Sequence, residues 1–109
     1  MFARHLIWKI KPNSIAEFKR ITDNQIVPLL FKHKGFREQM YFVSPESLEA
    51  VSASMWDSKE DAEAYTSAAF PEVLRLLSPV SDGPPTVKTF EIASSTAQKA
   101  ATAKGASST

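Results

Sequence analysis

The segment Ala53-Ser-Met-Trp-Asp-Ser-Lys-Glu-Asp-Ala-Glu-Ala-Tyr65 decides the fold of this chain. It starts as an alternating strand that ends at the large aromatic Trp56, and a helix is predicted to begin two residues later. Ser58 can accept a hydrogen bond from a free amide of the first helical turn, with Asp61 three residues further on. Tyr65 then falls on the apolar stripe of the helix, while the charged residues lie on its solvent-exposed face. The segment therefore predicts a strand that passes directly into a helix.

Outward from this junction, hydrophobic periodicity and turn signals predict the other elements of a small α+β domain. The first helix is expected to begin at a capping box of Ser14 and Glu17, to kink or break at Pro28 and to stop at Gly35. The remaining elements are strands over 2–11, 36–43, 48–56 and 86–92, a turn over 44–47, and a helix over 59–77 interrupted at Pro71.

The element order β-α-β-β-α-β predicts a ferredoxin-like fold. Right-handed crossovers place both helices on one face of a four-stranded antiparallel sheet. On the first strand, Phe2, Leu6, Trp8 and Ile10 are expected on one face, interrupted by Arg4, and Ala3, His5 and Ile7 on the other. The second strand is expected to place Phe36, Met40 and Phe42 opposite Arg37, Gln39 and Tyr41.

The sheet face away from the helices is not cleanly polar, since Ala3, Ile7, Tyr41 and Val43, or their alternates, also need cover. A second sheet packed against it would supply that cover. The sequence therefore predicts a homodimer through the sheet face.

Composition limits the possible classes. The chain has 109 residues, which suits one domain over 1–92, and a low-complexity tail over 93–109 is expected to be disordered. A net charge of +1 without a basic stripe argues against nucleic acid as a partner. Cysteine is absent and histidine occurs twice, so no metal site built by the protein is expected. No apolar run is long enough to span a membrane and no signal peptide is visible, which favours a cytoplasmic protein.

Several short motifs resemble one family. They are Lys9-Ile-Lys-Pro12, Val27-Pro-Leu-Leu30 before Gly35-Phe36, Ser54-Met-Trp-Asp-Ser58 with Ala62-Glu-Ala-Tyr65, and Gly83-Pro-Pro-Thr86. With them, residues 2–92 resemble the antibiotic biosynthesis monooxygenase (ABM) superfamily of dimeric α+β barrels, and the stress-responsive α/β-barrel family shares much of the pattern. The resemblance implies a cavity between helices and sheet, where some members oxidise quinol-like aromatics without metal or flavin. We therefore expect no cofactor.

Other members of the superfamily degrade haem, and this chain departs from their pattern. The haem-degrading branch relies on an Asn, a Trp and a His at positions that hold Leu6, Tyr65 and Arg75 here. Leu cannot donate a hydrogen bond to an iron-bound ligand, and Arg cannot replace an axial His. Haem degradation is therefore not expected.

Each candidate catalytic residue has a structural alternative. His5 is the one plausible general base in a strand, and a structural histidine inside the dimer is the alternative. Tyr65 can donate a hydrogen bond into the cavity, or it can be a core residue whose hydroxyl reaches solvent. His33 is interpreted as a solvated cation at a helix end.

The candidate substrate-binding residues also have structural alternatives. Trp56 can point its indole N–H at a substrate, or anchor the following helix with that N–H bonded to backbone. Arg75 can border the pocket and hold an anionic substrate, or be a surface residue. Five further large apolar residues are expected in the core or cavity wall: Trp8, Phe18, Met40, Phe42 and Phe90.

Two functions fit this sequence. The first is a cofactor-independent monooxygenase acting on a small aromatic or quinol-like substrate. The second is a non-catalytic dimeric protein that binds a small apolar ligand or serves a stress-responsive role.

Overall fold

The computed structural model describes residues 1–94 and residue 96. Its strands are β1 (Phe2–Lys9), β2 (Phe36–Ser44), β3 (Glu49–Trp56) and β4 (Thr86–Glu91). Its helices are α1 (Ile15–Ile21), α2 (Val27–Phe31) and α3 (Lys59–Leu77), with a π-helical segment, Thr22–Ile26, between α1 and α2. The predicted disorder of the tail over 93–109 concerns positions that lie almost entirely outside the described residues.

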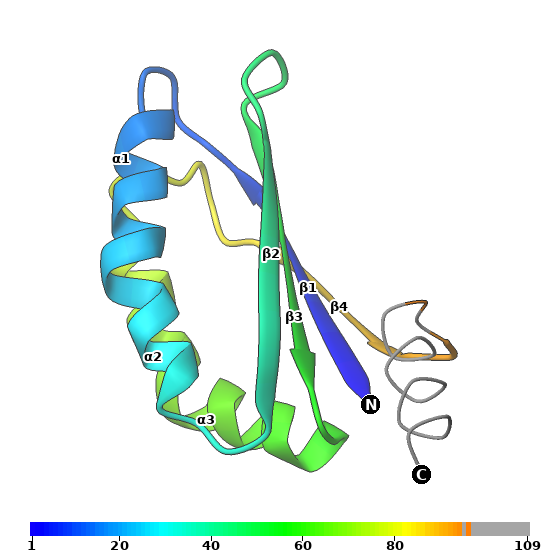
Figure 1. The fold of residues 1–109 in the computed structure, drawn as a ribbon. Helices are drawn as coiled ribbons and strands as arrows, with labels where there is room; N and C mark the ends of the chain where they lie inside the picture. The colour runs from blue at the N-terminus through cyan, green and yellow to red at the C-terminus, as the bar shows by residue number, and fades with distance from the viewer. Residues whose placement is uncertain (95, 97–109) are drawn as a thin grey trace, which may run out of the picture.

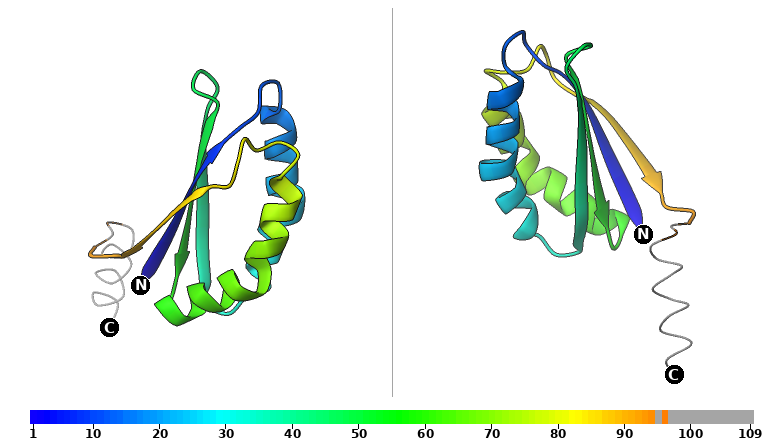
Figure 2. Two further views of the ribbon diagram at one scale, coloured as in Figure 1. Left: turned by 180° about the vertical axis from the view of Figure 1, so that it is seen from behind. Right: turned by 45° about the horizontal axis from the view of Figure 1, so that its top comes forward.

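The strands form one four-stranded sheet in the order β2-β3-β1-β4, and every neighbouring pair is antiparallel. All three helices lie on the same side of this sheet and leave its other face open (Figures 1 and 2). The predicted ferredoxin-like βαββαβ fold is therefore confirmed.

The hydrophobic core lies between the helices and the sheet. From the sheet, Leu6 and Trp8 of β1 are buried in it, as their alternation predicted, and Trp56 is fully buried at the end of β3. From the helices, Leu30 and Val73 are among its most deeply buried side chains. This packing fixes α1, α2 and α3 against one sheet face.

The two predicted helix starts differ in their caps. Ser58 caps α3 as expected, because its hydroxyl accepts a hydrogen bond from the Asp61 amide at 3.1 Å. The predicted capping box at α1 is wrong. The Ser14 side chain caps no amide there, and its hydroxyl instead donates to the Pro12 carbonyl at 3.3 Å across the turn that contains Asn13 at φ 61°.

Both internal prolines are accommodated without ending their helices. The first helical region continues past Pro28 because the backbone widens into the π-helical segment just before it, which relieves the crowding that a proline ring imposes on the preceding turn. Pro71 lies inside α3, and that helix bends along its length where it follows the sheet (Figure 2). Gly35 ends the first helical region at φ 82°, as predicted, and a side chain there would collide with Asp61.

The predicted faces of β2 are wrong for most of the strand. A register shift between Phe36 and Glu38 adds one residue on β2, so Phe36 faces the helices while Met40 and Phe42 face away from them. Met40 and Phe42 are 47% and 57% exposed, although the sequence predicted them in the core or cavity wall. The bulge turns Gln39 and Tyr41 toward the helices instead.

Candidate functional site

A small cavity lies inside the core, where the π-helical segment, α2 and α3 cover β1, β2 and β3. Its volume of about 30 Å³ leaves room for about two water molecules. Its apolar wall includes Leu6, Trp8, Phe18, Ile26 and Leu30, and its polar groups come mainly from Arg4, Thr22, Gln39, Tyr41 and Tyr65. The cavity is therefore mostly apolar with a few convergent polar groups, which is the composition of a small-molecule site, but its volume holds only water-sized groups.

Tyr65 is the polar group that α3 contributes. Its ring is 3% exposed and packs against Trp56 and His33, each at a centroid distance of 5.1 Å. Its hydroxyl makes no hydrogen bond within residues 1–94 and 96. Burial raises the pKa of Tyr65, and the nearby positive charge of Arg4 offsets part of that rise. The phenol is therefore protonated at neutral pH and free to donate a hydrogen bond into the cavity.

Arg4 is the second notable polar group, and it comes from β1. It is only 4% exposed, and its guanidinium carbon lies 4.2 Å from the centre of the Phe70 ring. Burial lowers the pKa of Arg4, while Tyr65 acts in the opposite direction. Arg4 and Tyr65 are therefore close enough to influence each other electrostatically across the cavity wall.

The remaining polar groups of the cavity are partly satisfied. Tyr41 donates to the Asp23 carboxylate at 3.0 Å, and Gln39 donates to the Ser52 hydroxyl at 3.3 Å. Burial, followed by the contact with Asp23, raises the pKa of Tyr41 to about 12. The hydroxyl of Thr22 is buried without a partner among the residues described. Thr22 opens the π-helical segment, and such segments are frequent at functional sites.

A wider groove lies next to this cavity, between α3 and the β1–β4 side of the sheet. Its volume is about 470 Å³, and its walls include Phe2, Phe70 and Val87. Arg4 lines both the cavity and the groove. The Arg4 side chain therefore belongs to the walls of both spaces.

Three of the predicted site residues line the cavity. Trp8 and Phe18 meet edge to face at a centroid distance of 5.9 Å in its wall, and Tyr65 contributes its polar group. Trp56 lies behind Tyr65 and is not part of the wall. Its indole N–H donates to the Ser54 hydroxyl at 3.0 Å, so its contacts are those of the anchoring role, with a side-chain partner in place of the expected backbone one.

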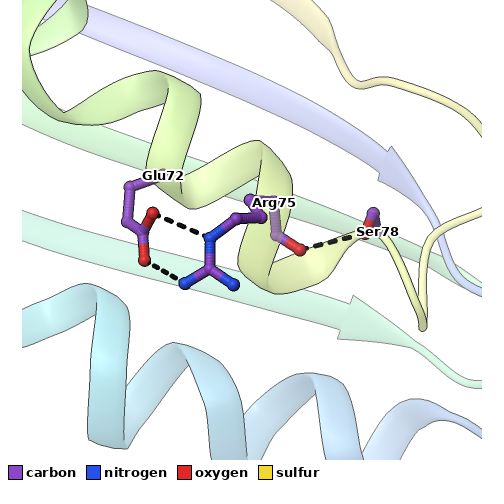
Figure 3. A network of polar contacts seen from close by, with 3 residues as sticks. All are labelled: Glu72, Arg75 and Ser78. Atoms are coloured by element: carbon purple, nitrogen blue, oxygen red, sulfur yellow. Dashed lines mark hydrogen bonds and ion pairs between the residues drawn. The ribbon is translucent and has the colours of Figure 1, made fainter.

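Arg75 points away from the cavity. Its side chain is 68% exposed and binds Glu72 one turn back on α3, with Nε donating to a carboxylate oxygen at 2.9 Å (Figure 3). Ser78 adds a hydrogen bond to the Arg75 carbonyl at 2.9 Å. The pocket role considered for Arg75 is therefore corrected, because ten residues of helix after Tyr65 bring it round to the solvent side.

His5 and Phe42 lie on the open face of the sheet. His5 packs edge to face against Phe90 at a centroid distance of 5.1 Å, and Phe42 stands on β2 beyond the bulge. The structure therefore does not bring His5 and Tyr65 to one site, and Phe42 does not line the cavity. A catalytic role for His5 would need a separate site on the open face.

Arg4 is the site residue that sequence reasoning missed. The signal was present, since Arg4 is the one charged residue among Phe2, Leu6 and Trp8 on the apolar face of β1. A lone charge at such a position indicates either a buried ion pair or a ligand site. Gln39 and Tyr41 had no comparable signal, because only the bulge turns them inward.

The part of the chain that the structure describes holds neither a metal-binding cluster nor a membrane-spanning helix. Over residues 1–94 and 96, no three histidine, aspartate or glutamate side chains gather where they could hold a metal ion. None of the helices in that part of the chain has the length and apolar character needed to cross a membrane.

No protein-family model and no curated protein matches this sequence. Solved structures do match. The ActVA-Orf6 monooxygenase of Streptomyces coelicolor, solved with nanaomycin D, is 17% identical, with 86% of this chain and 88% of that chain aligned at a TM-score of 0.74. SnoaB of Streptomyces nogalater, a cofactor-independent oxygenase, is 11% identical over 87% of this chain and 95% of its own, with a TM-score of 0.73.

A third match comes from Bordetella bronchiseptica, a structure described as a "Putative antibiotic biosynthesis monooxygenase". It is 18% identical and covers 85% of this chain and 97% of its own, with a TM-score of 0.74. This chain has the ABM fold. At these identities the likeness establishes the fold alone, and the predicted resemblance to the ABM superfamily is confirmed at that level.

Proposed function

We propose that this ABM-like protein is a cofactor-independent monooxygenase that acts on a small aromatic or quinol-like substrate. The observation that carries the proposal is the Tyr65 hydroxyl, which makes no hydrogen bond in the described chain and belongs to a residue that lines a cavity with Trp8 and Phe18. Two solved structures with the same fold are a monooxygenase and a cofactor-independent oxygenase. Fold and cavity together favour this reaction class over hydrolysis or group transfer.

The substrate itself would supply the electrons. An activated methylene group of the substrate reacts with one molecule of dioxygen to give a ketone carbonyl and one molecule of water. The carbon is oxidised, one oxygen atom stays on it, and the other leaves as water with the two methylene hydrogens. The reacting species is the substrate anion, and a hydrogen bond from Tyr65 to its oxygen would stabilise the developing charge. The raised pKa of Tyr65 suits this role, since the phenol keeps its proton at neutral pH.

The cavity offers no evident general base. Its titratable lining groups, within the described part of the chain, are Arg4, Tyr41 and Tyr65, and no histidine or carboxylate lines it. The substrate would therefore lose its proton to water, or enter as an anion. The cavity holds only water-sized groups, so the ring of the substrate would lie in the adjoining groove, with its reacting oxygen directed past Arg4 toward Tyr65. Substrates that ionise readily suit this arrangement.

Oxygen uptake on a panel of anthrones and quinols tests this proposal. We expect turnover by the full chain, with Tyr65→Phe lowering kcat about 100-fold because one donor to the oxyanion is lost. Arg75→Gln is the matched control and should keep full activity, since Arg75 binds only Glu72 on the solvent side. No turnover with any compound of the panel, or equal turnover by Tyr65→Phe, would contradict the proposal.

A second function is a non-catalytic dimeric protein that binds a small ligand or serves a stress-responsive role. The absence of a base in the cavity wall, as far as the chain is described, favours it. It predicts that a bound aromatic raises the melting temperature while mass spectrometry of the same mixture finds no oxidised product.

We also propose that the protein forms a homodimer through the open face of its sheet. Met40, Phe42 and Phe90 are 47%, 57% and 47% exposed there, which is unusual for a face of large apolar residues left in water. We further propose a cytoplasmic location, which cell fractionation tests.

A further inference from the structure

We propose that Arg4 and the adjoining groove bind an aromatic acid, with the ligand's oxyanion on the Arg4 guanidinium and its ring in the groove. The oxyanion is a carboxylate or a phenolate. The inference deepens the proposed monooxygenase function by naming the substrate class, and it rests on that function only for the reaction that follows binding.

The first observation is a buried cation without a counter-charge. Arg4 is 4% exposed, and none of the ion pairs or side-chain hydrogen bonds within residues 1–94 and 96 involves its guanidinium. All twelve Asp and Glu residues of the sequence lie in the described part of the chain. No aspartate or glutamate side chain is therefore left to pair with Arg4, and an anion that enters from the groove would supply the missing counter-charge.

The second observation is how the guanidinium is held. Its carbon lies over the Phe70 ring, 4.2 Å from the ring centre, which is a cation–π contact. This contact uses no N–H group, and the planar fork of a guanidinium matches the two oxygens of a carboxylate. Arg4 is thus held beside the groove with its N–H donors unused by the described residues.

The third observation is the space beside it. The inner cavity, at about 30 Å³, is too small for an aromatic ring, whereas the groove at about 470 Å³ is within the range of small-molecule sites. Phe2, Phe70 and Val87 give the groove an apolar wall. The charged residues of the groove other than Arg4 are Lys59 and Glu63, which pair with each other at 3.8 Å in solvent and so add no net charge.

The hydroxyl of Tyr65 completes the site on the cavity side. It has no hydrogen-bond partner among the described residues and lines the same cavity as Arg4, so it can donate a second hydrogen bond to an anion at the guanidinium. A neutral aromatic would fill the same groove but leave Arg4 unpaired. The site therefore favours the anion.

Calorimetric titration of the full-length protein with matched probes tests the proposal. The probes are 2-naphthoate, its neutral isostere 2-naphthamide, and 4-nitrophenolate in mildly alkaline buffer. We expect 2-naphthoate to bind at least about ten-fold more tightly than the amide, which is about 1.4 kcal/mol. Binding of 4-nitrophenolate decides whether a phenolate serves as well as a carboxylate. Equal affinity for naphthoate and naphthamide would overturn the proposal.

Two pairs of variants locate the site. Arg4→Met should remove the preference for naphthoate, while Arg75→Met, which deletes the same charge on the solvent side of α3, should keep it. Ser67→Trp places a bulky side chain in the groove and should weaken naphthoate binding about ten-fold or more, while Ala68→Trp, an exposed neighbour outside the groove wall, should not.

The controls separate folding and catalysis from binding. If Arg4→Met fails to fold by circular dichroism, Arg4→Lys, which keeps the charge but lacks the planar fork, should bind naphthoate more weakly than the native chain. Equal loss in Arg4→Met and Arg75→Met would overturn the site, because the effect would then be one of net charge. Preference for naphthoate without any oxygen uptake would support the site and contradict only the monooxygenase.

Discussion

Tyr41 and Tyr65 are the two tyrosines of this chain, and both line the cavity between helices and sheet. Each has its pKa raised mainly by burial, and that of Tyr41 reaches about 12 with the help of Asp23. Every phenol signal of the protein therefore reports on the candidate site. This makes tyrosine ionisation a direct measure of the environment that the structure describes.

We expect the folded protein to show little tyrosinate absorbance until the pH is well above 10, the usual tyrosine pKa, whereas the urea-denatured chain titrates near about 10. Because folding raises these two pKa values, their contribution to stability is complete below about pH 10 and is lost as the pH rises through the folded values. Tyr41→Phe should make the fall in stability between pH 10 and about 12 shallower. Normal titration of both phenols in the folded protein would contradict this account.

Arg4 and Arg75 differ in how clearly the sequence alone indicated their surroundings. Both were visible in the sequence, but only Arg4 interrupts an apolar strand face, and the structure buries it beside the cavity. Arg75 was considered for the pocket because it holds the position of a His in the haem-degrading relatives. Its spacing from Tyr65 allowed it only to border the pocket, and in the structure it lies on the solvent side. A charge in an apolar pattern was therefore the more reliable signal of the site.

At the scale of elements, the N-caps of α1 and α3 look alike in sequence and differ in structure. Ser58 accepts the Asp61 amide, whereas Ser14 donates across the preceding turn. We expect Ser58→Ala to lower the free energy of unfolding by about 1 kcal/mol. Ser14→Ala is the matched control and should change it by less than about 0.5 kcal/mol.

Urea denaturation of both variants checks this difference. Equal losses would mean that the Ser14 hydroxyl caps α1 in solution after all. The range of α3, Lys59–Leu77, agreed with the prediction because its cap and its apolar stripe are local signals. The bulge in β2 was not predictable, since it depends on pairing with β3 rather than on the residues near Phe36.

At the scale of the whole molecule, the open face of the sheet exposes large apolar residues that a second subunit would cover. Phe42 stands on this face at 57% exposure, and Phe31, at the end of α2, is exposed at 73% away from it. We expect light scattering at micromolar concentration to give the mass of two chains, and Phe42→Glu to give the mass of one, because a charge cannot be buried in that interface without cost.

Phe31→Glu is the matched control for this prediction, since it places the same charge on an equally aromatic position outside the sheet. It should leave the dimer intact. A native chain that scatters as a monomer, or equal effects of the two variants, would contradict dimerisation through the sheet.

The sequence by itself determined the element order, the cap and range of α3, and the inward face of β1, because these follow from periodicity and from contacts between near neighbours. Only the tertiary structure decided which side chains share the cavity. The β2 bulge turned Tyr41 inward and Phe42 outward, and helix packing buried Arg4 beside Tyr65. These outcomes depend on strand register and on packing between distant segments, which no local pattern encodes.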